Sequence, residues 1–339
     1  MNSIKDHDLS DNYSVKLPSQ PNTETRESAM INLTIPVDYV GLRLDQAIAK
    51  LLPNWSRARL QTWIIEQRVL LDGQATTVKQ KVWGNEHIQI VPHEVVTEST
   101  YSAEDINLDI VFEDETIIVI NKPAGLVVHP GNGNWHGTML NALLHHAPQL
   151  ANISRAGIVH RLDKETSGLL VVAKTIEAQT SLVRQLQQHT VKRDYMALVL
   201  GEVASSGSVD AAIGRHPTQR TKMAITVKGK PARTHYQPIE YFEGCTLLKC
   251  SLETGRTHQI RVHMLKIGHP LVGDPVYGGK PRKTQPIVGQ LLIHFSRQAL
   301  HAQKLALTHP NSKQVMQWEV LPPADMAQLL QELRECSRG

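Results

Sequence analysis

Residues 160–168 have the sequence His-Arg-Leu-Asp-Lys-Glu-Thr-Ser-Gly, a polar run between the apolar segments 157–159 and 169–173. Both flanking segments are short and apolar, which predicts buried strands. A charged loop between buried strands is typical of a functional site held on a rigid scaffold. Arg161 and Lys164 lie beside Asp163, and these cations favour its ionised form. Taken alone, the run also fits a turn with a structural Asp–Arg pair, and both interpretations stay open at this point.

Outward from this loop, short apolar runs alternate with turn residues. Residues 109–112 and 117–120 predict a hairpin, and Thr175 is in position to cap a helix. The further elements expected are strands at 195–200, 232–242 and 246–252 and a helix at 257–267. The pattern predicts a mixed, strand-rich α+β domain over residues 107–325, and residues 326–339 are expected to form a C-terminal tail.

A second polar cluster, residues 254–263, has the sequence Thr-Gly-Arg-Thr-His-Gln-Ile-Arg-Val-His. In a helix, His258 and Arg261 are three residues apart and share a face. Arg261 could then point back toward the loop that carries Asp163. The chain has 17 histidines, but it has no His-Glu-x-x-His motif and no His pair with the expected carboxylate partner, so no metal site is expected.

Other protein classes are excluded by composition and motif. Ser167 lacks the Gly-x-Ser-x-Gly elbow of serine hydrolases, and the chain has neither a P-loop nor a dinucleotide-binding glycine pattern. Its 3 cysteines are an odd number without zinc-ligand spacing, so a reducing compartment is expected. No apolar run approaches the ~18–20 residues that span a bilayer, and the polar N-terminus lacks a signal core. We therefore expect a cytoplasmic protein with no membrane partner.

Residues 41–91 form a candidate small module of two helices and two strands. The module has seven basic residues against four acids, which is most of the basic excess of a chain whose net charge is +4. Arg57 and Arg59 stand in the first turn of the second expected helix, where the helix dipole disfavours cations. Cations there make sense if that end of the helix faces phosphates. A solvated face explains so short a run equally well.

The remaining charge is also unevenly distributed. Residues 1–30 are polar and acidic and are expected to be a disordered tail, and residues 92–106 a linker. Residues 211–239 contain no Asp or Glu and six basic residues, among them Arg215, Arg220 and Lys222. This stretch is expected to contact phosphates, because the basic module at 41–91 indicates the same kind of partner.

The 160–168 loop resembles the signature loop of the RluA-type pseudouridine synthases. Supporting segments occur in the family's order, at residues 121–126, 193–197, 255–263 and 269–274. The module at 41–91 resembles an S4 RNA-binding domain. Together these resemblances cover residues 33–325. They imply the pseudouridine synthase fold, with a mixed, mostly antiparallel central sheet and flanking helices, preceded by the S4 domain.

The resemblance implies that uridine in RNA is isomerised to pseudouridine, with no cofactor. Asp163 matches the family's catalytic carboxylate, which either attacks C1′ of the ribose or removes the C2′ proton. Arg261 matches its basic partner, and Tyr195 the tyrosine that stacks on uracil and helps remove the C5 proton. Arg161 resembles the residue that fills the gap left by the flipped base.

The resemblance also implies a substrate, the 23S rRNA of the large ribosomal subunit or its precursor, at the helix 69 stem-loop. A monomer is expected. The alternative is a non-catalytic RNA-binding or ribosome assembly factor that keeps the same fold. The residues expected to contact RNA are Arg161, His160, Arg43, Arg57, Arg59, Arg215, Arg220, Lys222 and Arg256.

Overall fold

The computed structural model describes residues 26–27, 30–53, 55, 57–94, 101–131, 134–219, 221–281 and 284–337. Most of the tail expected at 1–30, and part of the linker expected at 92–106, lie outside these ranges. Within them, β1 (Arg26–Glu27) pairs with β6 (His93–Glu94).

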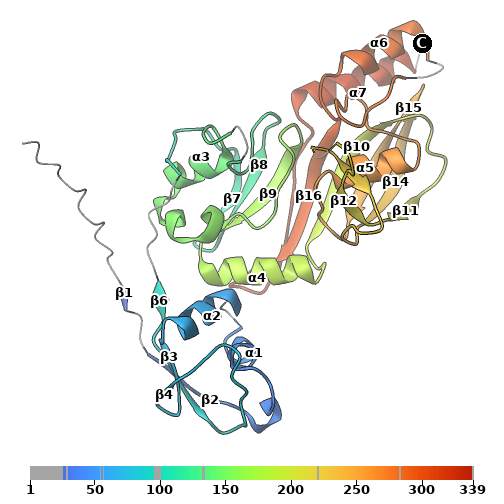
Figure 1. Ribbon diagram of the computed structural model, residues 1–339. Helices are drawn as coiled ribbons and strands as arrows, with labels where there is room; N and C mark the ends of the chain where they lie inside the picture. The colour runs from blue at the N-terminus through green and yellow to red at the C-terminus, as the bar shows by residue number, and fades with distance from the viewer. Residues whose placement is uncertain are drawn as a thin grey trace, which may run out of the picture.

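The N-terminal module is a four-stranded sheet, ordered β2-β5-β3-β4, with two helices packed on it (Figure 1). Its elements are β2 (Ile31–Thr34), η1 (Val37–Tyr39), α1 (Leu44–Leu51), α2 (Arg57–Ile65), β3 (Val69–Leu71), β4 (Gln74–Ala75) and β5 (His87–Ile90). Leu44, Ile48 and Trp63 are buried between the helices and the sheet. The sheet of the module also includes β2, which begins at residue 31 and pairs along its whole length with β5.

A nine-stranded sheet runs through the larger domain, in the order β11-β14-β15-β10-β16-β9-β8-β7, with β17 paired to β16. Its strands are β7 (Ile110–Glu113), β8 (Ile117–Lys122), β9 (Ser167–Ala173), β10 (Lys192–Leu200), β11 (Gly207–Asp210), β14 (Arg233–Phe242), β15 (Cys245–Leu252), β16 (Leu300–Thr308) and β17 (Val315–Glu319). Among the described strands of this sheet, only β9 and β16 pair in parallel, over two residue pairs. Gly168 lies at this junction with a φ of +109°, and a Cβ there would come within 2.3 Å of the Ala302 carbonyl oxygen.

Helices cover the sheet and its ends (Figure 1). They are α3 (Met139–His146), η2 (Pro148–Asn152), η3 (Ser154–Gly157), α4 (Ile176–Gln187), α5 (Gln259–Lys266), α6 (Pro286–His294) and α7 (Ala324–Cys336). Thr175 caps α4 as expected, its hydroxyl accepting a hydrogen bond from the Ala178 N–H. A short hairpin of β12 (Ile213–Arg215) and β13 (Met223–Ile225) occupies part of the acid-free stretch 211–239.

Two local predictions are wrong. Residues 157–159 form no strand, because Arg155, Ala156 and Gly157 have positive φ values and leave only a single bridge from Ile158 to Val172. The expected C-terminal tail at 326–339 is instead largely the helix α7. Its apolar residues Met326, Leu329, Leu330 and Leu333 recur at helical spacing and are buried with residues of α6.

Candidate active site

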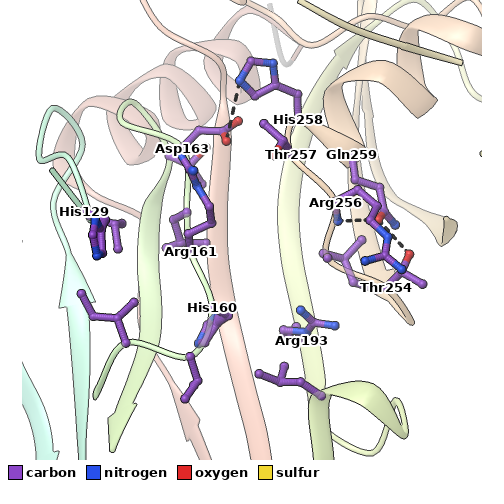
Figure 2. A pocket seen from close by; sticks show the side chains of 18 of the residues that line it. His129, His160, Arg161, Asp163, Arg193, Thr254, Arg256, Thr257, His258 and Gln259 are labelled. Carbon is purple, nitrogen blue, oxygen red and sulfur yellow. Dashed lines mark hydrogen bonds and ion pairs between the residues drawn. The ribbon is translucent and has the colours of Figure 1, made fainter. Parts of the chain in front are cut away.

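The 160–168 loop, β10 and the segment 252–261 enclose a cavity of about 970 Å³. Figure 2 shows Asp163, Arg161 and His160 on one wall and Arg193, Arg256 and His258 on the other. The last two residues of the 160–168 loop begin the buried strand β9, and α5 begins within the opposite segment. The topology of the sheet thus brings together two polar clusters that are about a hundred residues apart in the sequence.

Asp163 is held at this cavity by Arg261. The Arg261 Nη1 donates a hydrogen bond of 3.0 Å to Asp163 Oδ2, and the Asp163 side chain is 16% exposed. The expected approach of Arg261 to the Asp163 loop is therefore present. Asp163 lines the cavity with a carboxylate that is held beside a fixed cation, an arrangement that can act on a bound ligand.

Asp274 fixes Arg261 from the other side. Its two oxygens accept hydrogen bonds of 2.6 and 2.8 Å from the Arg261 Nε and Nη2, and its Oδ1 also accepts from the backbone N–H groups of Val276 and Tyr277. Burial acts to raise the pKa of Asp274, but the bonds and charge of Arg261 outweigh burial and lower it. Burial likewise acts to lower the pKa of Arg261, and the two carboxylates raise it overall. The guanidinium is thus permanently charged and oriented.

His258 is the second group that faces Asp163. Its Nε2 lies 3.9 Å from Asp163 Oδ1, and it stands at the start of α5 with a φ of +56°. The Tyr277 hydroxyl accepts from the Met223 N–H, so its own hydrogen is available to His258 Nδ1 at 2.8 Å. Burial lowers the pKa of His258 more than Asp163 raises it. These contacts favour a neutral imidazole with its hydrogen on Nε2, directed toward Asp163.

Lys122, at the end of β8, supports the Asp163 loop from beneath. It is fully buried, and its Nζ donates to the carbonyl oxygens of Pro123, Leu126 and Lys164 at 2.7, 2.9 and 2.9 Å. Burial lowers the pKa of Lys122 to about 7, against the opposing charges of Glu165 and Asp163. Because Lys164 follows Asp163 directly, these bonds help to fix the position of the carboxylate.

Tyr195 lines the same cavity from β10 and is 6% exposed. A register shift between Asp194 and Tyr195 interrupts the pairing of β10 with β16. Burial raises the pKa of the Tyr195 hydroxyl, and the nearby Arg193 opposes this effect only in part. The phenol is therefore protonated at neutral pH and presents a neutral ring to the cavity.

Known proteins are similar to this chain in fold and in sequence. The sequence pattern of the RNA pseudouridylate synthase family matches residues 116–266, and that of the S4 domain matches residues 42–88. The ribosomal large subunit pseudouridine synthase D of Nitrosomonas europaea is 59% identical over 323 residues, which is 95% of this chain and 93% of that relative. The chain belongs to the pseudouridine synthase family.

A further relative and a solved structure agree. Ribosomal large subunit pseudouridine synthase D of Escherichia coli (strain K12) is 51% identical over 312 residues, covering 91% of this synthase and 95% of the relative. The structure of human RNA pseudouridylate synthase domain containing 4 is 25% identical with a TM-score of 0.54, covering 66% of this chain and 92% of that one. The predicted α+β synthase fold with an S4 domain is thus confirmed, and the enzyme is an isomerase.

The residues expected to contact RNA do not all lie together in the synthase. His160, Arg161, Arg215 and Arg256 line the cavity. His160 accepts a hydrogen bond from the Val171 N–H at its Nε2, and burial lowers its pKa to about 3. It is a neutral group that braces the loop against β9.

Arg43, Arg57 and Arg59 lie in the S4 module, away from the cavity, and Lys222 lies at the β12–β13 hairpin. Arg220 is outside the described residues. Arg43 and Arg57 both bond the fully buried carboxylate of Asp45, at 3.0 and 2.7 Å. A buried anion thus accounts for Arg57 at the start of α2, where the sequence suggested a phosphate.

Sequence reasoning gave no role to Asp274, Lys122, Tyr277 or Arg193. For Asp274 and Lys122, the sequence did contain a signal. A buried arginine such as Arg261 needs an acid, and Asp274 stands in one of the segments that resemble the family. Lys122 ends the strand β8 just after its apolar run, and a lysine buried there has to meet backbone acceptors or an acid. In the described residues, no three His, Cys, Asp or Glu gather as a metal-binding group, and no helix is both long and apolar enough to cross a membrane.

Proposed function

We propose that this synthase converts uridines of large-subunit ribosomal RNA to pseudouridine, with the helix 69 stem-loop of 23S rRNA as its target. The observation that carries the proposal is the contact between Asp163 and the buried Arg261 at an arginine-lined cavity. Identity of 59% over nearly the whole length of a large-subunit synthase supports the choice of RNA.

The reaction exchanges one bond to the ribose for another. The N1–C1′ bond of uridine breaks, the uracil turns, a C5–C1′ bond forms, and the C5 proton leaves. Cleavage of a glycosidic bond makes C1′ electron-poor, which requires an anion at the sugar. Asp163 supplies this anion, by attack at C1′ or by removal of the C2′ proton. Tyr195 presents its ring to the uracil and is the proposed participant in loss of the C5 proton.

The cavity has the size and charge that a flipped nucleotide needs. Its volume of about 970 Å³ is at the upper end of the ~300–1,000 Å³ typical of ligand sites. Arg161, Arg215 and Arg256 line its walls, and we propose that they contact phosphates. Arg161 is exposed, which supports the proposal that it fills the gap left by the extruded base. The substrate RNA is therefore bound through its backbone around a single extruded base.

The S4 module is the proposed second contact with RNA, and it increases affinity rather than the rate of the chemical step. We further propose that the enzyme acts as a monomer in the cytoplasm. The monomer is supported by the fact that one chain supplies all of the groups named above as acting on the uridine. The cytoplasm is supported by the proposed substrate, ribosomal RNA.

Tritium release tests the proposed function. The wild-type protein is incubated with 23S rRNA carrying 5-tritiated uridine, as free RNA and in ribosomal subunits, and the modified positions are mapped. The expected result is release of one tritium per target uridine in the helix 69 loop. RNA binding without release from either substrate would instead establish the alternative, a non-catalytic assembly factor.

A further inference from the structure

Arg193 is a buried cation without a carboxylate partner. It stands on β10 two residues before Tyr195, lines the cavity and is 6% exposed. Its Nη2 donates to the Glu253 carbonyl oxygen at 3.3 Å, and its buried Nε has no hydrogen-bond partner. No ion pair to Arg193 exists within the described ranges. A buried charge is costly unless it is paired, so its side chain is prepared for a ligand that the protein does not supply.

The surroundings of Arg193 select an anion as this ligand. Arg256 adds a second positive charge nearby, and the neutral His160 adds none. Of the described residues that line the cavity, Asp163 is the single acid, and it already bonds Arg261. A neutral carbonyl group would leave both cations uncompensated, whereas a phosphodiester would neutralise one of them and accept a pair of N–H donors.

Gly255 gives the guanidinium its room. A Cβ at this position would lie 2.6 Å from the Arg193 Nη1, so any larger residue would displace the end of the side chain. Figure 2 shows Arg193 between His160 and Arg256. The guanidinium thus sits within the cavity, on the strand that also carries Tyr195.

We propose that Arg193 binds one phosphodiester of the RNA strand in the cavity, adjacent to the uridine that is isomerised. This proposal rests on the function proposed above, and it names a substrate-binding residue that fixes the register of the strand. The contact orients the strand so that the extruded ribose meets Asp163 and its uracil meets Tyr195.

The test pairs a change in the protein with a change in the RNA. Methylphosphonates, which carry no charge, replace the phosphates around the target uridine one at a time in a stem-loop substrate. Affinity and tritium release are measured for the wild type and for Arg193→Met, which keeps length and removes charge. At one phosphate, the methylphosphonate should weaken wild-type affinity about 10- to 100-fold, as expected for a charge-assisted hydrogen bond, and should not weaken Arg193→Met further.

Two variants separate this contact from general effects. Lys192→Met removes a charge from an exposed neighbour on the same strand. Its RNA affinity should fall as much as that of the wild type when the methylphosphonate replaces that phosphate. Gly255→Ala keeps the charge of Arg193 but displaces the guanidinium. The methylphosphonate at that phosphate should therefore weaken the affinity of Gly255→Ala less than it weakens the wild-type affinity.

Stability separates binding from a structural role. Arg193→Met should melt at the wild-type temperature or above, because it removes an uncompensated buried charge. Two results would overturn the proposal. One is that, at every phosphate, the methylphosphonate weakens the affinity of Arg193→Met by the same factor as that of the wild type. The other is that Arg193→Met is less stable than the wild type while its affinity responds to the methylphosphonates as the wild-type affinity does. Absence of tritium release by the wild type would count against the proposed function, whereas the coupling in affinity is measured independently of release.

Discussion

Asp274→Asn is expected to separate the orientation of Arg261 from its charge. Asp274 has no exposed side-chain surface and accepts four hydrogen bonds, two from Arg261 and two from backbone N–H groups. Asparagine offers one acceptor oxygen and turns an NH₂ group toward donors. Arg261 keeps Asp163 as its counter-ion but loses the bidentate contact that fixes the plane of the guanidinium.

Both stability and rate should fall by amounts that follow from this geometry. Removal of one partner of a buried ion pair costs about 3–5 kcal/mol, and we expect the lower end, about 3 kcal/mol, because Arg261 retains Asp163. A displacement of about 1 Å in a catalytic group lowers the rate about 100-fold. That factor corresponds to about 2.7 kcal/mol in the activation barrier, and it should appear in kcat rather than in KM.

Urea unfolding measures the first effect and single-turnover tritium release the second. Glu240→Gln is the matched control, because it breaks a bidentate pair with Arg334 on the exposed surface, at 2.7 and 2.9 Å, away from the cavity. This control should cost less than about 1 kcal/mol and leave kcat unchanged. Full kcat in Asp274→Asn would refute the role of Asp274 in orienting Arg261, whatever the loss of stability.

Three further predictions concern pH, the loop support and the S4 module. The pKa of Asp274 is lowered on folding. The stability that its ionised form contributes should therefore be fully present above about pH 4 and be lost as the pH falls through the lowered pKa. The difference in free energy of unfolding between the wild type and Asp274→Asn should shrink accordingly when unfolding is measured at increasingly acid pH. Lys122→Met removes the buried ammonium that donates to three backbone carbonyl groups, and this should cost about 2–4 kcal/mol in urea unfolding. A loss below about 0.5 kcal/mol would contradict the support described for the Asp163 loop. Deletion of residues 1–90 should weaken RNA affinity and flatten its salt dependence with little change in kcat at saturating RNA, and a loss confined to kcat would argue against an anchoring role.

Local structure in the catalytic domain was largely predictable from the sequence. The strands expected at 195–200, 232–242 and 246–252 lie within or largely coincide with β10, β14 and β15, and the hairpin of β7 and β8 and the cap at Thr175 are present. The C-terminal helix was also encoded, since the apolar residues of α7 recur at helical spacing. By contrast, residues 157–159 resemble a strand in composition, and the turn formed by left-handed residues before them is not visible in a hydrophobic pattern.

Long-range ion pairs were the part that the sequence could not supply. Asp163 and Arg261 are 98 residues apart, and only the sheet order places them 3.0 Å from each other. In the S4 module, the burial of Asp45 decides where Arg43 and Arg57 point. Several arginines close together in a sequence suggest a phosphate-binding face. The sequence alone does not show that a buried acid, here Asp45, binds two of them. Resemblance to the family pointed to Asp163, Arg261 and Tyr195 as the proposed catalytic residues, but it gave no indication of the groups that position them.

The central claim, that Asp163 is the carboxylate that acts on the ribose, is tested most directly by Asp163→Asn in single-turnover tritium release at saturating enzyme. The variant should bind RNA within about threefold of the wild type while release falls by about 10⁴-fold or more, the scale for loss of a catalytic group. Glu165→Gln makes the same change of charge two residues along the loop and should release tritium normally. Release by Asp163→Asn at the wild-type rate would contradict the account.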